Sequence, residues 1–84
     1  MSHPTLIAVN EDTSLHPNAK FLFCLLYGYA TNGTAVVEEA KIAALMEIGE
    51  SRLRAYRAQI NGSGFGRVKM SDGYLTFILA SKWQ

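Results

Sequence analysis

Five basic side chains lie close together along the chain, with no acidic residue between them. Residues 51–69 carry four arginines, one lysine and no Asp or Glu, whereas residues 1–50 carry two lysines against six acidic side chains. The net charge of +1 therefore hides a strongly basic segment. Arginine and lysine bind phosphates, and arginine also binds guanine edges, so the segment indicates nucleic-acid binding. A basic run is also typical of a solvated helix face, so its meaning depends on the element that carries it. The basic residues are Arg52, Arg54, Arg57, Arg67 and Lys69.

The remaining side chains form no catalytic or metal-binding pattern. No carboxylate pair, Ser-His pair or Cys-His pair has the spacing of a catalytic site, so we expect no enzyme activity and no small-molecule substrate. His3, His16 and the lone Cys24 are too few and too widely spaced to hold a metal ion. The glycine-rich run 62–66 resembles a phosphate loop, but it leads from a helix into a strand, the reverse of such loops. It predicts a left-handed glycine cap, and no cofactor is expected.

Length and composition predict a small folded domain. A chain of 84 residues, of which 49% are hydrophobic, is near the size at which burial only modestly exceeds the entropic cost of folding, so a partner subunit would help. One cysteine excludes an internal disulfide, and no signal sequence is present, so we expect a cytoplasmic protein. The longest apolar run, 21–27, is far shorter than the roughly 20 residues that span a bilayer, so no membrane association is expected.

The basic segment begins inside a pair of predicted helices between residues 36 and 60. The first helix is expected to bury apolar residues in the part that precedes the turn. The second has apolar residues at helical spacing, namely Leu53, Tyr56 and Ile60. A tight turn separates them. This layout is a helix-turn-helix, whose second helix reads the DNA major groove. The residues that the second helix leaves largely in water are Ser51, Arg52, Arg54, Ala55 and Arg57.

An apolar helix is predicted to precede this pair. Pro17 suits its first position, because the missing N–H of proline costs nothing there, and residues 31–33 end it. Between Ala19 and Tyr29 it is apolar on almost every side, so one face is left either for a homodimer partner or for the N-terminal arm to cover. Cys24 is expected to be a packed apolar residue rather than a nucleophile.

The other elements are short. Residues 34–36 predict a brief strand, and residues 65–82 a hairpin around Asp72-Gly73, with Val68 opposite Phe77. Arg67, Lys69, Tyr74 and Thr76 then lie on its outward face. Residues 5–9 are β-prone, so residues 1–14 are interpreted as an arm or edge strand and residues 15–84 as the domain. Trp83 could either seal the domain or stay exposed. The predicted core contains Phe21, Leu25, Ile42, Leu45, Leu53, Val68 and Phe77.

The run I-A-A-L-M-E-I-G-E-S-R-L resembles the helix-turn-helix core of winged-helix DNA-binding domains. Three positions depart from the usual pattern: Glu47 replaces the turn glycine, Gly49 replaces a Ser N-cap, and Arg57 stands where many members have an apolar residue. We therefore expect Glu47 to adopt a left-handed conformation. The residues that match are Ile42, Ala43, Leu45, Met46, Ile48 and Leu53.

Residues 15–80 resemble the small winged helix-turn-helix domains of phage and plasmid replication initiators and related regulators, whose first helix often carries Leu15, Ala19 and Lys20 in this spacing. The resemblance implies an α+β fold with three helices, a C-terminal β-hairpin wing and a short N-terminal strand. It also implies sequence-specific binding of double-stranded DNA, in transcription regulation or in replication, with helix 50–61 in the major groove.

Each candidate DNA-binding residue has an expected role. Ser51, Arg52 and Arg54 are expected at base edges, and Arg57, Arg67 and Lys69 at phosphates. Ala55 and Tyr74 complete the candidate interface. The alternative is a winged-helix protein-interaction module or assembly adaptor that does not bind DNA, because this fold serves both purposes.

Overall fold

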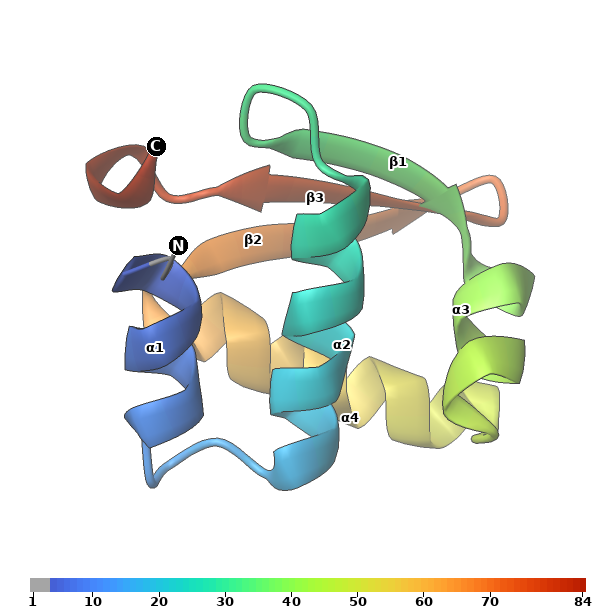
Figure 1. Cartoon of the computed structure of the whole chain (residues 1–84). Helices are drawn as coiled ribbons and strands as arrows, with labels where there is room; N and C mark the ends of the chain where they lie inside the picture. The colour runs from blue at the N-terminus through green and yellow to red at the C-terminus, as the bar shows by residue number, and fades with distance from the viewer. Residues whose placement is uncertain (1–3) are drawn as a thin grey trace.

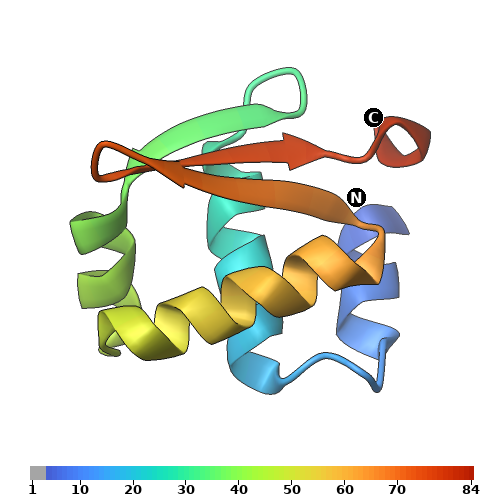
Figure 2. The same cartoon turned by 180° about the vertical axis from the view of Figure 1, so that it is seen from behind.

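A computed structural model describes residues 4–84 as four helices and one three-stranded sheet (Figure 1). The α+β class is as predicted, but there is one more helix than expected. All four helices lie on one face of the sheet, and the other face is open (Figures 1 and 2). The elements are α1 (Pro4–Glu11), α2 (Pro17–Tyr29), β1 (Thr34–Glu38), α3 (Glu39–Met46), α4 (Glu50–Ser63), β2 (Gly66–Ser71), β3 (Tyr74–Leu79) and the 3-10 turn η1 (Ser81–Trp83).

Of the two alternatives for residues 5–9, an arm or an edge strand, the edge strand is wrong, because these residues belong to helix α1. Thr5 and Val9 are four residues apart and both buried, which is the spacing of one helix face. Packing of this face against the core outweighs the β propensity of the individual residues. The first residues of the expected arm, including His3, lie outside the described part of the chain.

Helix α2 begins as predicted and buries only one side. Pro17 is its first residue, and His16 caps it by accepting a hydrogen bond at Nδ1 from the Asn18 N–H at 3.0 Å. The side toward the sheet is buried, whereas Phe21 is 45% exposed and Cys24 is exposed. The predictions that Phe21 joins the core and that Cys24 is packed are therefore wrong. The sheet covers α2 from one side only, and among the described residues no second layer packs on the opposite side. The side of α2 that faces away from the sheet therefore stays in solvent.

The turn between α3 and α4 has the predicted backbone. Glu47 adopts the left-handed conformation (φ 56°, ψ 42°) and ends α3, and the extended Gly49 precedes α4 without a side-chain capping bond. Ile42 and Met46 face the core from α3. Leu45 points sideways and is 48% exposed, so its predicted place in the core is wrong.

The sheet has the antiparallel order β1-β3-β2. The predicted hairpin register is confirmed, with Val68 opposite Phe77, and the turn at Asp72-Gly73 has positive φ at both residues, as a type I′ turn requires. Strand β1 is two residues longer than predicted and pairs with the other side of β3. The hairpin strand β3 is therefore the centre of the sheet.

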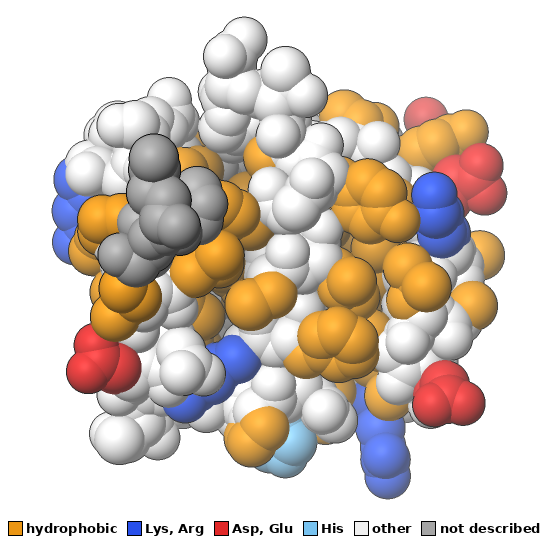
Figure 3. All heavy atoms as spheres, in the orientation of Figure 1, with side chains coloured by type: hydrophobic (Ala, Val, Ile, Leu, Met, Phe, Trp, Pro, Cys, Tyr) orange, Lys and Arg blue, Asp and Glu red, His pale blue; other side chains and the backbone are white. Residues whose placement is uncertain are grey.

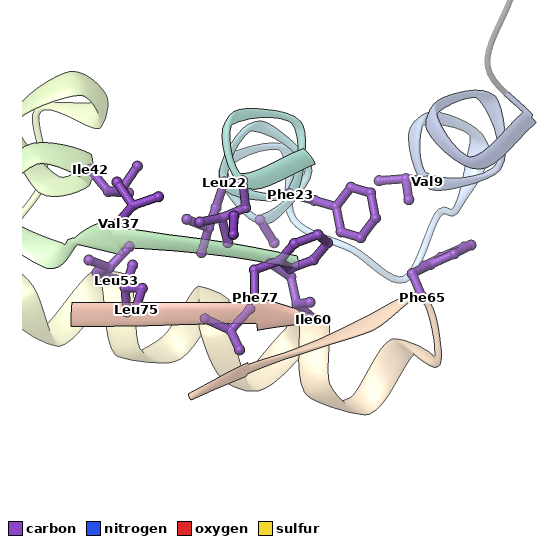
Figure 4. Packing of buried hydrophobic residues seen from close by; sticks show 14 of the residues in the cluster. Val9, Leu22, Phe23, Val37, Ile42, Leu53, Ile60, Phe65, Leu75 and Phe77 are labelled. Carbon is purple, nitrogen blue, oxygen red and sulfur yellow. The ribbon is translucent and has the colours of Figure 1, made fainter. Parts of the chain in front are cut away.

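The core forms where the central strand meets α2 (Figure 4). Phe77 is fully buried and packs edge-on against Phe23, with ring centroids 5.3 Å apart. Phe23 also meets Phe65 at 6.1 Å, and Trp83 covers Phe65 at 5.7 Å while remaining half-buried. Among the described residues, no helix combines the length and apolarity needed to cross a membrane.

The two kinds of apolar position predict different stability losses. Replacing Phe77 with Ala should lower the free energy of unfolding by about 3–5 kcal/mol, because it leaves a cavity at the centre of the core. Replacing Leu45 with Ala should cost less than about 1 kcal/mol, because the side chain is half exposed. Urea unfolding of both variants checks this, and equal losses would contradict the packing described.

Candidate nucleic-acid interface

Helix α4 is anchored to the core through two fully buried side chains. Leu53 and Ile60 lie seven residues apart on its inner face, and both have no exposed surface. Gly64 ends the helix in the left-handed conformation (φ 83°), as the glycine-rich run predicted. The helix extends two residues beyond the predicted 50–61. These contacts fix which side of α4 faces solvent.

One flank of α4 is attached to the start of α2. The Gln59 Oε1 accepts a hydrogen bond from the His16 N–H at 2.8 Å, and the Asn18 Nδ2 donates to the Tyr56 hydroxyl at 3.2 Å. The His16 and Tyr56 rings stack with centroids 5.1 Å apart. This flank therefore rests on polar and aromatic contacts rather than on the apolar core.

The other flank of α4 is attached to the edge of β2 by a single amide. The Asn61 Nδ2 donates to the Val68 carbonyl at 3.1 Å, and the Asn61 Oδ1 accepts from the Val68 N–H at 2.7 Å. One side chain thus satisfies both backbone groups that Val68 directs away from β3. Sequence reasoning missed Asn61, because nothing in its neighbourhood signals that an edge strand lies beside it.

The solvent side of α4 is a ridge of short side chains between two arginines. Ser51, Ala55 and Ala58 are exposed and lie opposite the buried residues by helical spacing. Arg54 belongs to the flank of Asn61, and Arg52 to the flank of Tyr56 and Gln59. Both arginines are exposed. The structure thus gathers the four predicted α4 residues Ser51, Arg52, Arg54 and Ala55 around one ridge.

Arg57 differs from its prediction. It was expected to lie largely in water, but it is half-buried on the β2 flank, and its Nε is buried without a hydrogen-bond partner among the described residues. Its position one turn before Asn61 directs it toward the gap between helix and strand.

The predicted wing residues form a separate group on the open face of the sheet. Arg67 and Lys69 are exposed on β2, where they alternate with buried residues, and Tyr74 on β3 is 46% exposed. Lys69 faces Thr76, whereas Tyr74 lies between Glu38 and Ser71 near the hairpin turn. Because they alternate with the core-facing Val68 and Leu75, these side chains leave the sheet on the face turned away from the helices, which is the open face of the sheet in Figure 2.

The start of α4 adds unpaired donors to this surface. The first N–H groups of a helix lack intrahelical partners, and Gly49 supplies no side chain to cap them. Together with the helix dipole, such groups attract anions. Glu50, in the first turn of α4, opposes this attraction, whereas residues 51–71 carry no acidic side chain.

No other part of the described chain gathers reactive groups. Among the described residues, no three His, Cys, Asp or Glu side chains lie together as a metal site requires. Although Cys24 is exposed, its neighbours partly desolvate the thiol and raise its pKa, so the thiol stays protonated at neutral pH. A hollow of about 430 Å³ lies beside Tyr27, Gly33 and Trp83, away from α4, and Tyr27 is the one titratable side chain that lines it.

Asn61 gives the interface a local test. Replacing Asn61 with Ala leaves the N–H and C=O of the buried Val68 unpaired, so the free energy of unfolding should fall by about 1–3 kcal/mol. Hydrogen exchange at the Val68 amide should accelerate more than exchange at the central-strand Phe77 amide. The Gly62→Ala variant is the control, because open space surrounds that position. An unchanged Val68 exchange rate would contradict the role of Asn61.

Comparisons with protein-family models, with curated proteins and with solved structures give no match for this chain. The function must therefore be inferred from the surface described above.

Proposed function

We propose that this protein is a winged helix-turn-helix domain that binds double-stranded DNA sequence-specifically, in transcription regulation or in phage or plasmid replication. Helix α4 enters the major groove in this proposal, and the hairpin β2-β3 is the wing. The order of elements from α2 to β3 supports it, because helix, strand, helix, turn, helix and hairpin follow one another as in that family. The left-handed Glu47 between α3 and α4 supports it as well.

The exposed ridge of α4 carries the proposal. An α-helix with its side chains is about 10–12 Å across, and the major groove is about 12 Å wide, so a reading helix must enter closely. Ser51, Ala55 and Ala58 are short enough to permit this approach. Arg52 and Arg54 leave the two sides of the ridge, so each would face a different wall of the groove. An arginine fork there can bind both acceptors of a guanine.

Phosphate contacts would surround this ridge. The uncapped N–H groups at the start of α4 suit a backbone phosphate, whereas the Nε of Arg57 is buried and does not face one. Arg67 and Lys69 stand on the strand next to α4, so their long side chains would reach over its edge toward the flanking backbone. Phosphate contacts of this kind fix register but carry no sequence information.

A second candidate is a winged-helix interaction module that does not bind DNA. The observation in its favour is the exposed apolar side of α2, where Phe21 is 45% and Tyr29 is 42% exposed. Salt dependence separates the candidates, because displacement of counterions makes DNA binding weaken steeply with salt. An apolar protein contact responds far less.

The two groups of basic residues should respond differently to substitution. Replacing Arg52 or Arg54 with Ala should cost about 1–3 kcal/mol on the preferred duplex and reduce the preference for it. Arg54→Lys should retain non-specific binding yet lose preference, because lysine keeps the charge without the fork. Duplex titrations, after selection of the preferred sequence from a random pool, measure both effects.

Replacing Arg67 or Lys69 with Ala should instead weaken all duplexes alike and reduce the salt slope by about one for each lost contact. Lys82→Ala is the charge-matched control, because Lys82 lies over the Trp83 ring at the end of the chain. An Arg52 or Arg54 variant that keeps the wild-type ratio between preferred and scrambled duplexes would refute reading by α4. Salt-insensitive binding to a protein, with no duplex binding, would favour the interaction module.

A further inference from the structure

The two edges of the sheet differ in the partners that their outward-facing backbone groups have. Two backbone hydrogen bonds flank β1, from Leu79 N–H to Gly33 C=O and from Glu39 N–H to Gly73 C=O. They show that the odd-numbered residues of this stretch direct their backbone groups toward β3. By the alternation of antiparallel pairing, Thr34, Val36 and Glu38 direct their backbone groups outward instead. On β2 the outward positions are Gly66, Val68 and Met70, and Asn61 closes the middle one, Val68.

The outward edge of β1 is closed at one end only. Thr31 exchanges two backbone hydrogen bonds with Thr34, at 2.8 and 3.2 Å. Beyond it, the described residues provide no partner for the outward N–H and C=O of Val36 or for the N–H of Glu38. Open edges in natural sheets usually carry charged residues, especially lysine, or a proline or a bulge, and β1 carries only Glu38 at its end. Residues 36–38 therefore form an open edge.

Apolar side chains surround this open edge. Val36 is 64% exposed, the highest value among the exposed large hydrophobic residues described. Below it, Figure 3 shows apolar side chains gathered over α2 and α3, on the side that β1 borders in Figure 1. We call this group the helical patch, and it consists of Phe21, Leu25, Tyr29 and Leu45. Lys41 lies at its rim, with Nζ 4.9 Å from the Tyr29 ring centre.

We propose that this surface binds a second copy of the chain, by antiparallel pairing of residues 36–38 about a twofold axis at Val37. In this register Val36 of each copy lies opposite Glu38 of the other. Each Glu38 N–H donates to a Val36 carbonyl, and each Val36 N–H donates to a Glu38 carbonyl. Strand pairing cannot extend further, because Thr31 already occupies the outward backbone groups of Thr34. The two helical patches then face each other and supply the remaining contact.

A second copy suits the surface because the open edge is complementary to itself. A twofold axis brings identical donors and acceptors together in reverse order, and the register sets no like charges opposite each other. The apolar patch likewise meets an apolar patch. Helix α4 lies on the far side, beneath β2, so both copies keep it uncovered (Figure 2). The dimer is thus independent of the proposed DNA binding.

Charge substitutions at Val36 test the pairing. In Val36→Glu, the new glutamate of each copy lies opposite Glu38 of the other copy. This like-charge pair occurs twice in the dimer, so the dimer dissociation constant should rise by roughly tenfold or more. Val36→Lys sets lysine opposite Glu38 and should retain the dimer. Ile78→Glu is the control, because Ile78 is 43% exposed on the same sheet face but belongs to the central strand. Sedimentation over a range of micromolar concentrations measures all four proteins, and circular dichroism verifies their folding.

The proposal expects a wild-type dimer that Val36→Glu dissociates and that Val36→Lys and Ile78→Glu retain. A wild-type protein that stays monomeric throughout would overturn it and leave the surface to a different protein. Equal weakening by Val36→Glu and Val36→Lys would also overturn it, because only strand pairing distinguishes the two charges. Equal weakening by Val36→Glu and Ile78→Glu would place the contact on the sheet face instead of its edge.

Discussion

Phe77 occupies the middle of the central strand and packs edge-on against Phe23 of α2 at 5.3 Å. This contact joins the sheet to the helices, because β3 pairs with both other strands while α2 contacts the remaining helices. The sheet covers only one side of the helical layer, and each helix accordingly buries one side. The surfaces that remain for function are the outer sides of α4 and α2 and the open face of the sheet.

Helix α4 owes its orientation to contacts on three sides. The core holds its inner face through Leu53 and Ile60, the start of α2 holds one flank through Gln59, and β2 holds the other through Asn61. A helix fixed in this way presents one preorganised ridge, so binding would not have to order it. This favours recognition through α4, because ordering flexible side chains and loops at an interface lowers affinity.

Local signals allowed much of this fold to be predicted. Asp72-Gly73 fixes the hairpin register because few other sequences accept positive φ at both positions, and apolar spacing reveals the two helices around the turn. The failures arise where the local signal is absent. A helix that is apolar all round shows no orientation, so Phe21 of α2 was assigned to the core. Leu45 of α3 was assigned to it because Ile42, Leu45 and Met46 together suggested one packed face. Residues 5–9 satisfy strand and helix patterns alike, and Asn61 acquires its partner only through the tertiary fold.

The proposed function depends on contact between the α4 ridge and DNA. Amide chemical shifts of the isotopically labelled protein, recorded during titration with the selected duplex, test this contact. If α4 reads the DNA, we expect saturable changes concentrated at residues 50–58, with smaller changes at Arg67 and Lys69 and none at Leu25 or Leu45 of the helical patch. Changes confined to the helical patch, or spread evenly over the basic residues for preferred and scrambled duplexes alike, would contradict it.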